Sequence, residues 1–290
     1  MQNMSQVSAR IVKDVDIAQG SAFGEQAQVY WYEAQANFSG DTQTVCVFCI
    51  RSMASGAALH CAYFQATQQA LLEAHELAFA WFGGVFARIL YYNPRASVKN
   101  MCGVRQKQTE RFIAFRSHYG FEVYFCDPVE GYDQATVESA GYFRRNDAAA
   151  VPCVRDLADL NQQLLSACQQ DAQLTIGNQT ETSQSLMRRE RLHLHPSPRR
   201  FDLAEISFPR VDRSNCVRVR TNRYSTPLKP GMQAEAKAHA SYVEIWHNGQ
   251  LVGRHERCYK SRQQTFKLER HLQPLSSELG ALSASTARAA

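Results

Sequence analysis

Apolar and polar positions near the start of the chain alternate with the short period of β-strands. Aromatic and β-branched residues dominate three successive segments, Gln26–Ala34, Thr44–Arg51 and Ala58–Phe64. Each segment has the length and composition of a strand, and no helical pattern separates them. The sequence therefore predicts three consecutive strands that form a meander.

The period then lengthens to that of a helix. Thr67 can cap a helix whose apolar residues share one face, and Gly83-Gly84 ends it. A second helix begins at Thr109 and stops at Gly120. The other elements expected in this part are strands over Val85–Tyr92 and Phe121–Phe125, and helices over Gln134–Asn146 and Asp156–Gln170. Five strands with helices between the later ones predict a mixed α/β sheet.

The last third of the chain has a different pattern. Residues 173–210 are polar and poorly periodic, and we interpret them as a linker with a helical piece around Leu186 to Leu192. Short β segments then follow at Cys216–Arg220, Ala234–Ala240, Tyr242–His247 and Leu251–His255. Asn248-Gly249 between two apolar runs is a hairpin signal. Several short strands separated by turns favour a small β-barrel over 211–272. We expect the Ser- and Ala-rich residues 273–290 to be a disordered tail.

Composition narrows the class of protein. The 290 residues are 44% hydrophobic and 20% charged, which is a globular mixture. No stretch approaches the roughly 18 consecutive apolar residues of a membrane span, and residues 1–10 lack the apolar core of a secretory signal. Nine cysteines at irregular spacings indicate reduced thiols rather than a disulfide framework. We therefore expect a cytoplasmic protein without a membrane segment.

Charge is distributed unevenly along the chain. Residues 186–270 hold 18 Lys and Arg against 8 Asp and Glu, whereas the rest of the chain holds 14 against 19. A basic C-terminal third points to a polyanionic partner, for which nucleic acid is the obvious candidate. A solvated basic surface is the alternative interpretation.

Several long strings resemble the insertion-sequence transposases of the IstA type. The resemblance runs from Gly24 to Ala287, and the strings that carry it lie at Gly24–Ala34 (GEQAQVYWYEA), Arg51–Phe86, Thr109–Cys126, Gly141–Asn146 (GYFRRN) and Phe201–Gly231. It implies a ribonuclease-H-like integrase core followed by a small β-barrel C-terminal domain. The activity that it implies is DNA strand transfer at the ends of a mobile element. Double-stranded DNA at those ends, an ATPase helper protein and a homo-oligomer are the partners implied.

The resemblance also implies a division of the chain. We expect a degenerate N-terminal extension over 1–23, an integrase-like catalytic core over 24–172, a linker over 173–210, the small β-barrel over 211–272 and the tail over 273–290. Members of the family begin with a helix-turn-helix region, for which residues 1–23 leave no room. The sequence is therefore expected to be an N-terminally truncated copy.

Catalysis in such transposases depends on three carboxylates that hold two divalent metals, Mg²⁺ or Mn²⁺. The matching flanks place the first Asp position at Tyr30, the second at Tyr92 and the Glu position at Glu138. Only Glu138 is retained, and no Asp or Glu occurs between Leu77 and Thr109. A neutral phenol is a poor ligand for Mg²⁺ at pH 7, so we expect a copy that binds no metal and is catalytically inactive.

Arginines are the candidate DNA contacts. We expect phosphate contacts from Arg144 and Arg145 in the core and from Arg218, Arg220 and Arg223 in the C-terminal domain. A charged solvent face would show the same pattern.

Five alternatives remain open. Cys46 and Cys49 with His60-Cys61 could suggest zinc, although two cysteines three apart on a strand face opposite ways. His193 and His195 could be ligands or a solvated pair. The tyrosines at positions 30 and 92 could suggest a tyrosine recombinase. The chain could also be a non-catalytic DNA-binding or oligomerising module that modulates intact transposase, or an active recombinase with a rearranged metal site.

Overall fold

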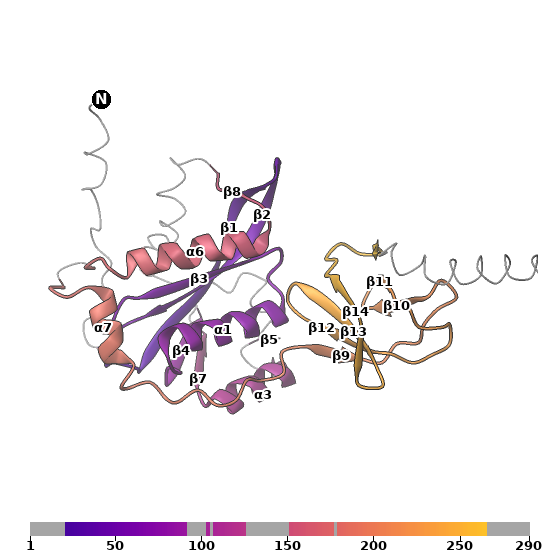
Figure 1. Ribbon diagram of the computed structural model, residues 1–290. Helices are drawn as coiled ribbons and strands as arrows, with labels where there is room; N and C mark the ends of the chain where they lie inside the picture. The colour runs from indigo at the N-terminus through magenta and orange to yellow at the C-terminus, as the bar shows by residue number, and fades with distance from the viewer. Residues whose placement is uncertain (1–20, 92–102, 105–106, 126–150, 177–178, 266–290) are drawn as a thin grey trace, which may run out of the picture. The chain divides into compact units, whose positions relative to one another are not determined.

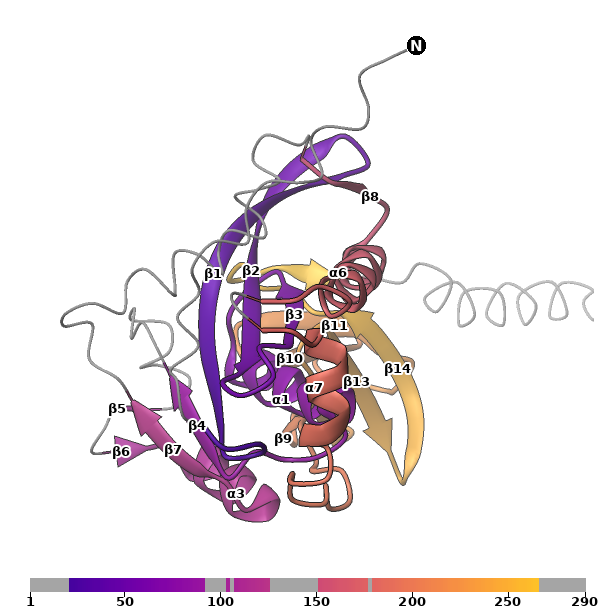
Figure 2. The ribbon, with the colours of Figure 1, turned by 90° about the vertical axis from the view of Figure 1, so that its left-hand side faces the viewer.

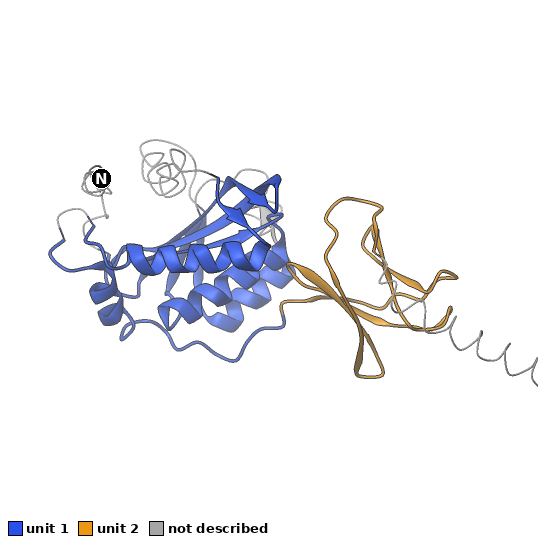
Figure 3. Ribbon diagram, turned by 45° about the horizontal axis from the view of Figure 1, so that its top comes forward, with its two compact units in different colours: residues 1–202 blue, residues 203–290 orange. Residues whose placement is uncertain are grey.

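The computed structural model describes residues 21–91, 103–104, 107–125, 151–176 and 179–265. The chain divides into two compact units, Met1–Asp202 and Leu203–Ala290, which are coloured separately in Figure 3. The first unit carries the mixed α/β fold that the sequence predicts. No helix in the described parts is long and apolar enough to cross a lipid bilayer.

A mixed sheet forms the centre of the first unit (Figure 1). Its strand order is β3-β2-β1-β4-β7, and the short β8 also pairs with β1. Strands β1 to β3 form the antiparallel meander, and β1, β4 and β7 run parallel. The bounds are β1 Gln26–Phe38, β2 Asp41–Ser52, β3 Ala58–Tyr63, β4 Arg88–Tyr91, β7 Glu122–Phe125 and β8 Cys153–Val154; β5 (Gly103–Val104) and β6 (Lys107–Gln108) pair separately. The five expected strands are confirmed, and β5, β6 and β8 are additions.

Capping residues set the ends of the helices on one face of this sheet. Helix α1 (Gln68–Phe82) begins where the Thr67 side chain accepts the Ala70 amide, and it ends at Gly83, which has φ of 84°. Helix α3 (Glu110–Tyr119) is capped in the same way by Thr109 and by Gly120. Both helices therefore begin and end at the residues that the sequence predicts.

Helix α6 (Leu157–Asp171) packs along β3, and Figure 2 shows this helix end-on. Leu160 and Leu164 pack with Val45 and Val47 of β2, whereas Phe48, the residue after Val47, lies on the opposite face and contacts His75 of α1. Asn161 also contacts the free edge of β3. Its side-chain amide accepts the Ala62 N–H at 2.7 Å and donates to the Ala62 carbonyl at 2.9 Å.

Helix α7 (Ser183–Glu190) lies in the segment that the sequence suggested as a linker. Its last residue, Glu190, is fully buried. The Glu190 carboxylate accepts hydrogen bonds from the Gly24 amide at 3.2 Å, Ser52 Oγ at 2.8 Å and Ser55 Oγ at 2.6 Å. These donors come from just before β1, from the last residue of β2 and from the turn that follows it, so α7 is an integral part of the first unit.

After α7, residues 191–202 form an extended strap along the first unit. Arg191 donates to the carbonyls of Trp81 and Phe82 at the end of α1, and His195 pairs with Val85 through two backbone hydrogen bonds of 2.9 Å. A Cβ added to Gly24 would lie 2.5 Å from the His193 carbonyl oxygen, which shows how closely the strap passes. At its far end, the Phe201 amide donates to Glu76 of α1. The first unit therefore includes this strap and ends at Asp202.

The second unit is built from short strands in two sheets. One sheet has the order β14-β13-β12-β9 and the other has the order β10-β11-β15. The bounds are β9 Glu205–Ser207, β10 Cys216–Val219, β11 Asn222–Ser225, β12 Glu235–Ala238, β13 Tyr242–His247, β14 Gln250–Glu256 and β15 Gln264–Thr265. A core of Val217, Val219, Tyr224, Val243 and Ile245 lies inside this unit.

The closed β-barrel expected over 211–272 is not found among the described strands. No pairing joins the edge strands β14 and β9, and β15 is only two residues long. The hairpin at Asn248-Gly249 is confirmed, with both residues at positive φ. Strands β9, β11 and β15 have no counterpart in the sequence prediction because they are short and carry few apolar residues.

Candidate functional site

Tyr30, the first position expected to bear a catalytic carboxylate, lies in the middle of β1 and is buried. Strand register places it opposite Cys49 of β2, which in turn lies opposite His60 of β3. Since directly opposed residues share a face, these three side chains lie together on one rung of the sheet. Tyr32 joins them, with its ring 6.1 Å from that of Tyr30.

His60 connects the members of this rung. Its Nδ1 lies 3.0 Å from the Tyr32 hydroxyl, and its Nε2 lies 3.6 Å from Cys49 Sγ. Burial, with the nearby positive charge of Arg51, lowers the pKa of His60 to about 3. Burial also raises the pKa of Cys49 to about 12, although Arg51 and a hydrogen bond from Tyr30 partly oppose this. The rung is therefore a neutral hydrogen-bonded group at physiological pH.

These side chains do not fit a pair of magnesium ions. Mg²⁺ takes hard oxygen ligands, chiefly carboxylates, in a site of net negative charge. A phenol, a protonated thiol and a neutral imidazole offer no such charge, and Arg51 adds a positive one. Within the described ranges, no group of three His, Cys, Asp or Glu side chains could hold a metal ion. Glu33, three residues along β1 from Tyr30, is exposed.

The other expected catalytic positions lie at or beyond the ends of described segments. Strand β4 ends at Tyr91, whose partner across the sheet is Val29. The buried Tyr91 hydroxyl lies 2.7 Å from His75 Nε2, and His75 Nδ1 donates to the Leu71 carbonyl at 2.7 Å. Tyr91 is thus part of the core beneath α1. Tyr92 and Glu138, like Arg144 and Arg145, lie outside the described residues.

The three candidate DNA contacts of the second unit differ in their environments. Arg223 donates to Asp212, with Nη2 2.5 Å from Oδ2, and Arg220 forms an ion pair with Glu205. Arg218 on β10 lies directly opposite Arg223 on β11, and Arg218 is exposed. Acidic neighbours therefore balance the charges of Arg220 and Arg223, and Arg218 presents the more available charge of the set.

The histidine and cysteine pairs singled out in the sequence are separated by the fold. Cys49 is buried in the rung. Cys46 lies three residues earlier on β2, opposite Tyr63, so its side chain is on the other face of the sheet. His193 stacks on Phe23, and His195 lies in the strap. The zinc alternative groups Cys49 with His60, and the fold brings these two side chains together; the sequence pattern missed their association with Tyr30 and Tyr32. The short connections between β1, β2 and β3, which fix their register, are the signal that could have revealed it.

Comparison with known proteins gives the wider relationship. Residues 196–267 match the family described as Mu transposase, C-terminal domain. Over 244 residues the chain is 29% identical to the transposase for insertion sequences IS1326/IS1353 of Pseudomonas aeruginosa, covering 83% of this chain and 48% of that protein. The curated relatives are transposases. Among them is the transposase for an IS21-like element of Bacteroides fragilis, 22% identical over 92% of this chain and 53% of its own length.

The chain spans about half the length of the curated relatives that it matches. Among solved structures, the catalytic core domain of HTLV-2 integrase in complex with magnesium matches with a TM-score of 0.40 and 13% identity. That alignment covers 57% of this chain and 96% of the integrase domain. The simian T-cell lymphotropic virus intasome matches with a TM-score of 0.41 and 12% identity, over 82% of this chain and 80% of the matched chain.

Proposed function

We propose that this chain corresponds to the integrase-like core and C-terminal portion of an insertion-sequence transposase that associates with mobile-element DNA without cutting or joining it. The observation that carries the proposal is the alignment with a transposase over 83% of the chain, together with the Mu-type C-terminal match over 196–267. The strand order β3-β2-β1-β4-β7, with three antiparallel strands followed by parallel ones, supports a ribonuclease-H-like core.

The inactivity of this copy is the second part of the proposal. A two-metal mechanism needs carboxylates that converge on the scissile phosphate and neutralise the metal charge. Tyr30 stands where the first would be required, and its partners Cys49 and His60 are held neutral by burial. The sheet accommodates this rung well, since the tyrosine ring is buried rather than displaced. Double-stranded DNA at the element ends, an ATPase helper and other copies of the chain are the partners that the proposal assigns.

A strand-transfer assay with element-end DNA tests the proposal. We expect no joining by the unmodified chain in Mg²⁺ or Mn²⁺, and no Mn²⁺ binding by calorimetry. The double substitution Tyr30→Asp with Tyr92→Asp should restore part of the metal binding, because it adds two hard oxygen ligands to the retained Glu138. If the unmodified chain joined DNA strands, and Glu138→Gln abolished that activity, the proposed loss of catalysis would be wrong.

A further inference from the structure

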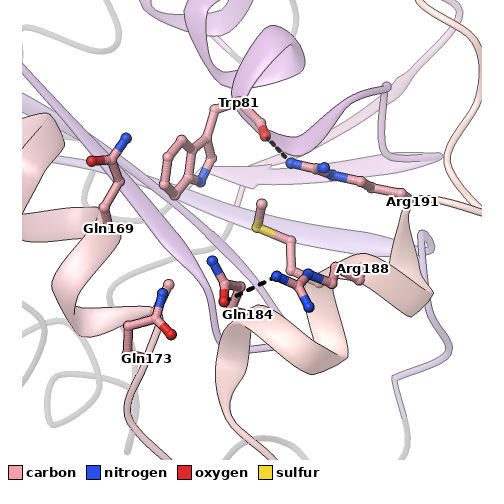
Figure 4. Close-up of a pocket in the computed structure, with 8 residues that line it drawn as sticks. Trp81, Gln169, Gln173, Gln184, Arg188 and Arg191 are labelled. Atoms are coloured by element: carbon pink, nitrogen blue, oxygen red, sulfur yellow. Dashed lines mark hydrogen bonds between the residues drawn. The ribbon is translucent and has the colours of Figure 1, made fainter.

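A pocket away from the Tyr30 rung lies among three elements of the first unit. It has a volume of about 410 Å³ and is lined by Trp81 of α1, by Gln169 of α6, and by Gln184, Met187 and Arg188 of α7, with Ala172, Gln173 and Arg191 completing it. Figure 4 shows these side chains converging from the ends of the three helices. Neither the transposase relationship nor the proposed metal chemistry gives this pocket a role.

The lining of the pocket is rich in hydrogen-bond donors. Two of the eight lining residues are arginines, three are glutamines and none is acidic. The indole Nε1 of Trp81 is buried and has no acceptor among the described residues. The arginine and glutamine side chains of the lining supply the accessible donors, and Trp81 and Met187 supply apolar surface. The chemistry of the lining therefore calls for an anionic ligand that also carries acceptor atoms and an apolar surface.

The two arginines have different degrees of freedom. Arg191 is committed to the end of α1, because its Nε and Nη2 donate to the carbonyls of Phe82 and Trp81 at 3.0 and 3.1 Å. Arg188 is exposed, and its contact with Gln184 is long, at 3.4 Å. Arg188 is thus the cation that can close on a ligand, while Arg191 adds a fixed positive charge beside it.

We infer that this pocket binds a nucleotide, with the base against the Trp81 indole and the phosphate on Arg188. Aromatic side chains stack on bases in a sequence-tolerant manner, and a guanidinium forms paired hydrogen bonds with phosphate oxygens. Amide side chains such as those of Gln169 and Gln184 suit the polar edges of a base. The volume lies within the roughly 300–1,000 Å³ of small-molecule sites. The nucleotide is either free or an unpaired residue at the end of a DNA strand.

Adjacent arginines on α7 provide a matched test. Arg189 does not line the pocket; it pairs with Glu181 at 2.8 Å and lies over the Phe23 ring. Arg188→Gln and Arg189→Gln remove the same charge from the same helix, so a non-specific electrostatic effect would change both equally. The full chain would be titrated calorimetrically with deoxyadenosine monophosphate, deoxyadenosine, inorganic phosphate, a blunt DNA duplex and the same duplex with a single-stranded overhang.

We expect saturable binding of the monophosphate that is stronger than that of either deoxyadenosine or phosphate. Arg188→Gln should weaken it roughly tenfold, as the loss of a charge-assisted contact predicts, whereas Arg189→Gln should change it by less than about twofold. Trp81→Phe should retain stacking, and Trp81→Leu should weaken binding further. Preference for the overhang over the blunt duplex, dependent on Arg188, would identify a strand end as the source; binding of the monophosphate alone would identify a free nucleotide.

Absence of saturable binding by both the monophosphate and the overhang duplex would overturn the inference. Equal weakening by Arg188→Gln and Arg189→Gln would do so too. None of these measurements requires strand transfer or a divalent metal, so their failure is distinguishable from a failure of the proposed function.

Discussion

Replacement of Glu190 should destabilise the first unit more than any comparable change on α7. The carboxylate is fully buried and accepts three hydrogen bonds, from the Gly24 amide, Ser52 Oγ and Ser55 Oγ, between 2.6 and 3.2 Å. In Glu190→Ala these donors remain in the interior without an acceptor. Each stranded buried donor costs about 1–3 kcal/mol, and solvent that enters the space offsets part of this. We expect a loss of about 3–5 kcal/mol in the free energy of unfolding.

Urea denaturation, followed by far-ultraviolet circular dichroism, measures this loss. Glu181→Gln is the matched control, because Glu181 lies one residue before the cap of α7 and forms a partly exposed ion pair with Arg189. That substitution should cost less than about 1 kcal/mol. Glu190→Gln should fall between the two, since its amide keeps one acceptor oxygen. A midpoint for Glu190→Ala equal to that of Glu181→Gln would refute the role assigned to the buried carboxylate.

Three further predictions concern the sheet, the core and the basic surface. Asn161→Leu should lower the free energy of unfolding by about 1–2 kcal/mol and promote self-association, because the edge of β3 loses its hydrogen-bond partner. Urea denaturation measures the first effect and sedimentation the second, with Gln162→Leu as the control. Burial lowers the pKa of His75 to about 4, below its unfolded value near 6.5. The contribution of the neutral imidazole to stability should therefore be fully present above about pH 6.5 and should decline as the pH falls towards 4. His75→Gln should flatten this decline in the urea midpoints, and an unchanged pH profile would contradict the prediction. If the second unit binds DNA, Arg218→Gln should reduce the logarithmic salt dependence by about 1, whereas Arg223→Gln should chiefly lower stability through Asp212; equal changes in salt dependence would count against the distinction.

The local signals in the sequence were sufficient for the elements of the first unit. Thr67 and Thr109 are side chains that cap helix starts, and Gly83 and Gly120 adopt the positive φ that ends them. These features depend on residues within four positions of each other, so the sequence exposes them directly. The alternation in β1 to β3 depends on local period in the same way.

The boundary of the first unit could not be predicted in this manner. Helix α7 has few apolar residues, and its attachment depends on Glu190 meeting Gly24 and Ser52, which lie 166 and 138 residues away. From the sequence alone, a glutamate in a polar segment is expected to be exposed, so the burial of Glu190 could not be predicted. Likewise, the grouping of Tyr30 with Cys49 and His60 follows from strand register, which composition does not fix and which only the short connections between β1, β2 and β3 indicate.

The strap over 191–202 has a consequence for modularity. A part can be exchanged between proteins only where few contacts cross the join. Residues 173–202 make many such contacts with the rest of the first unit: Glu190 accepts from Ser52, His195 pairs with the Val85 backbone, and Phe201 donates to Glu76. A splice at residue 172 would leave the Trp81 and Phe82 carbonyls of α1 without their Arg191 donor and would remove the backbone of His193 that packs against Gly24. A splice after Asp202 would cut none of these contacts. Gene fusions and domain exchanges in related chains should therefore tolerate joins at this later position.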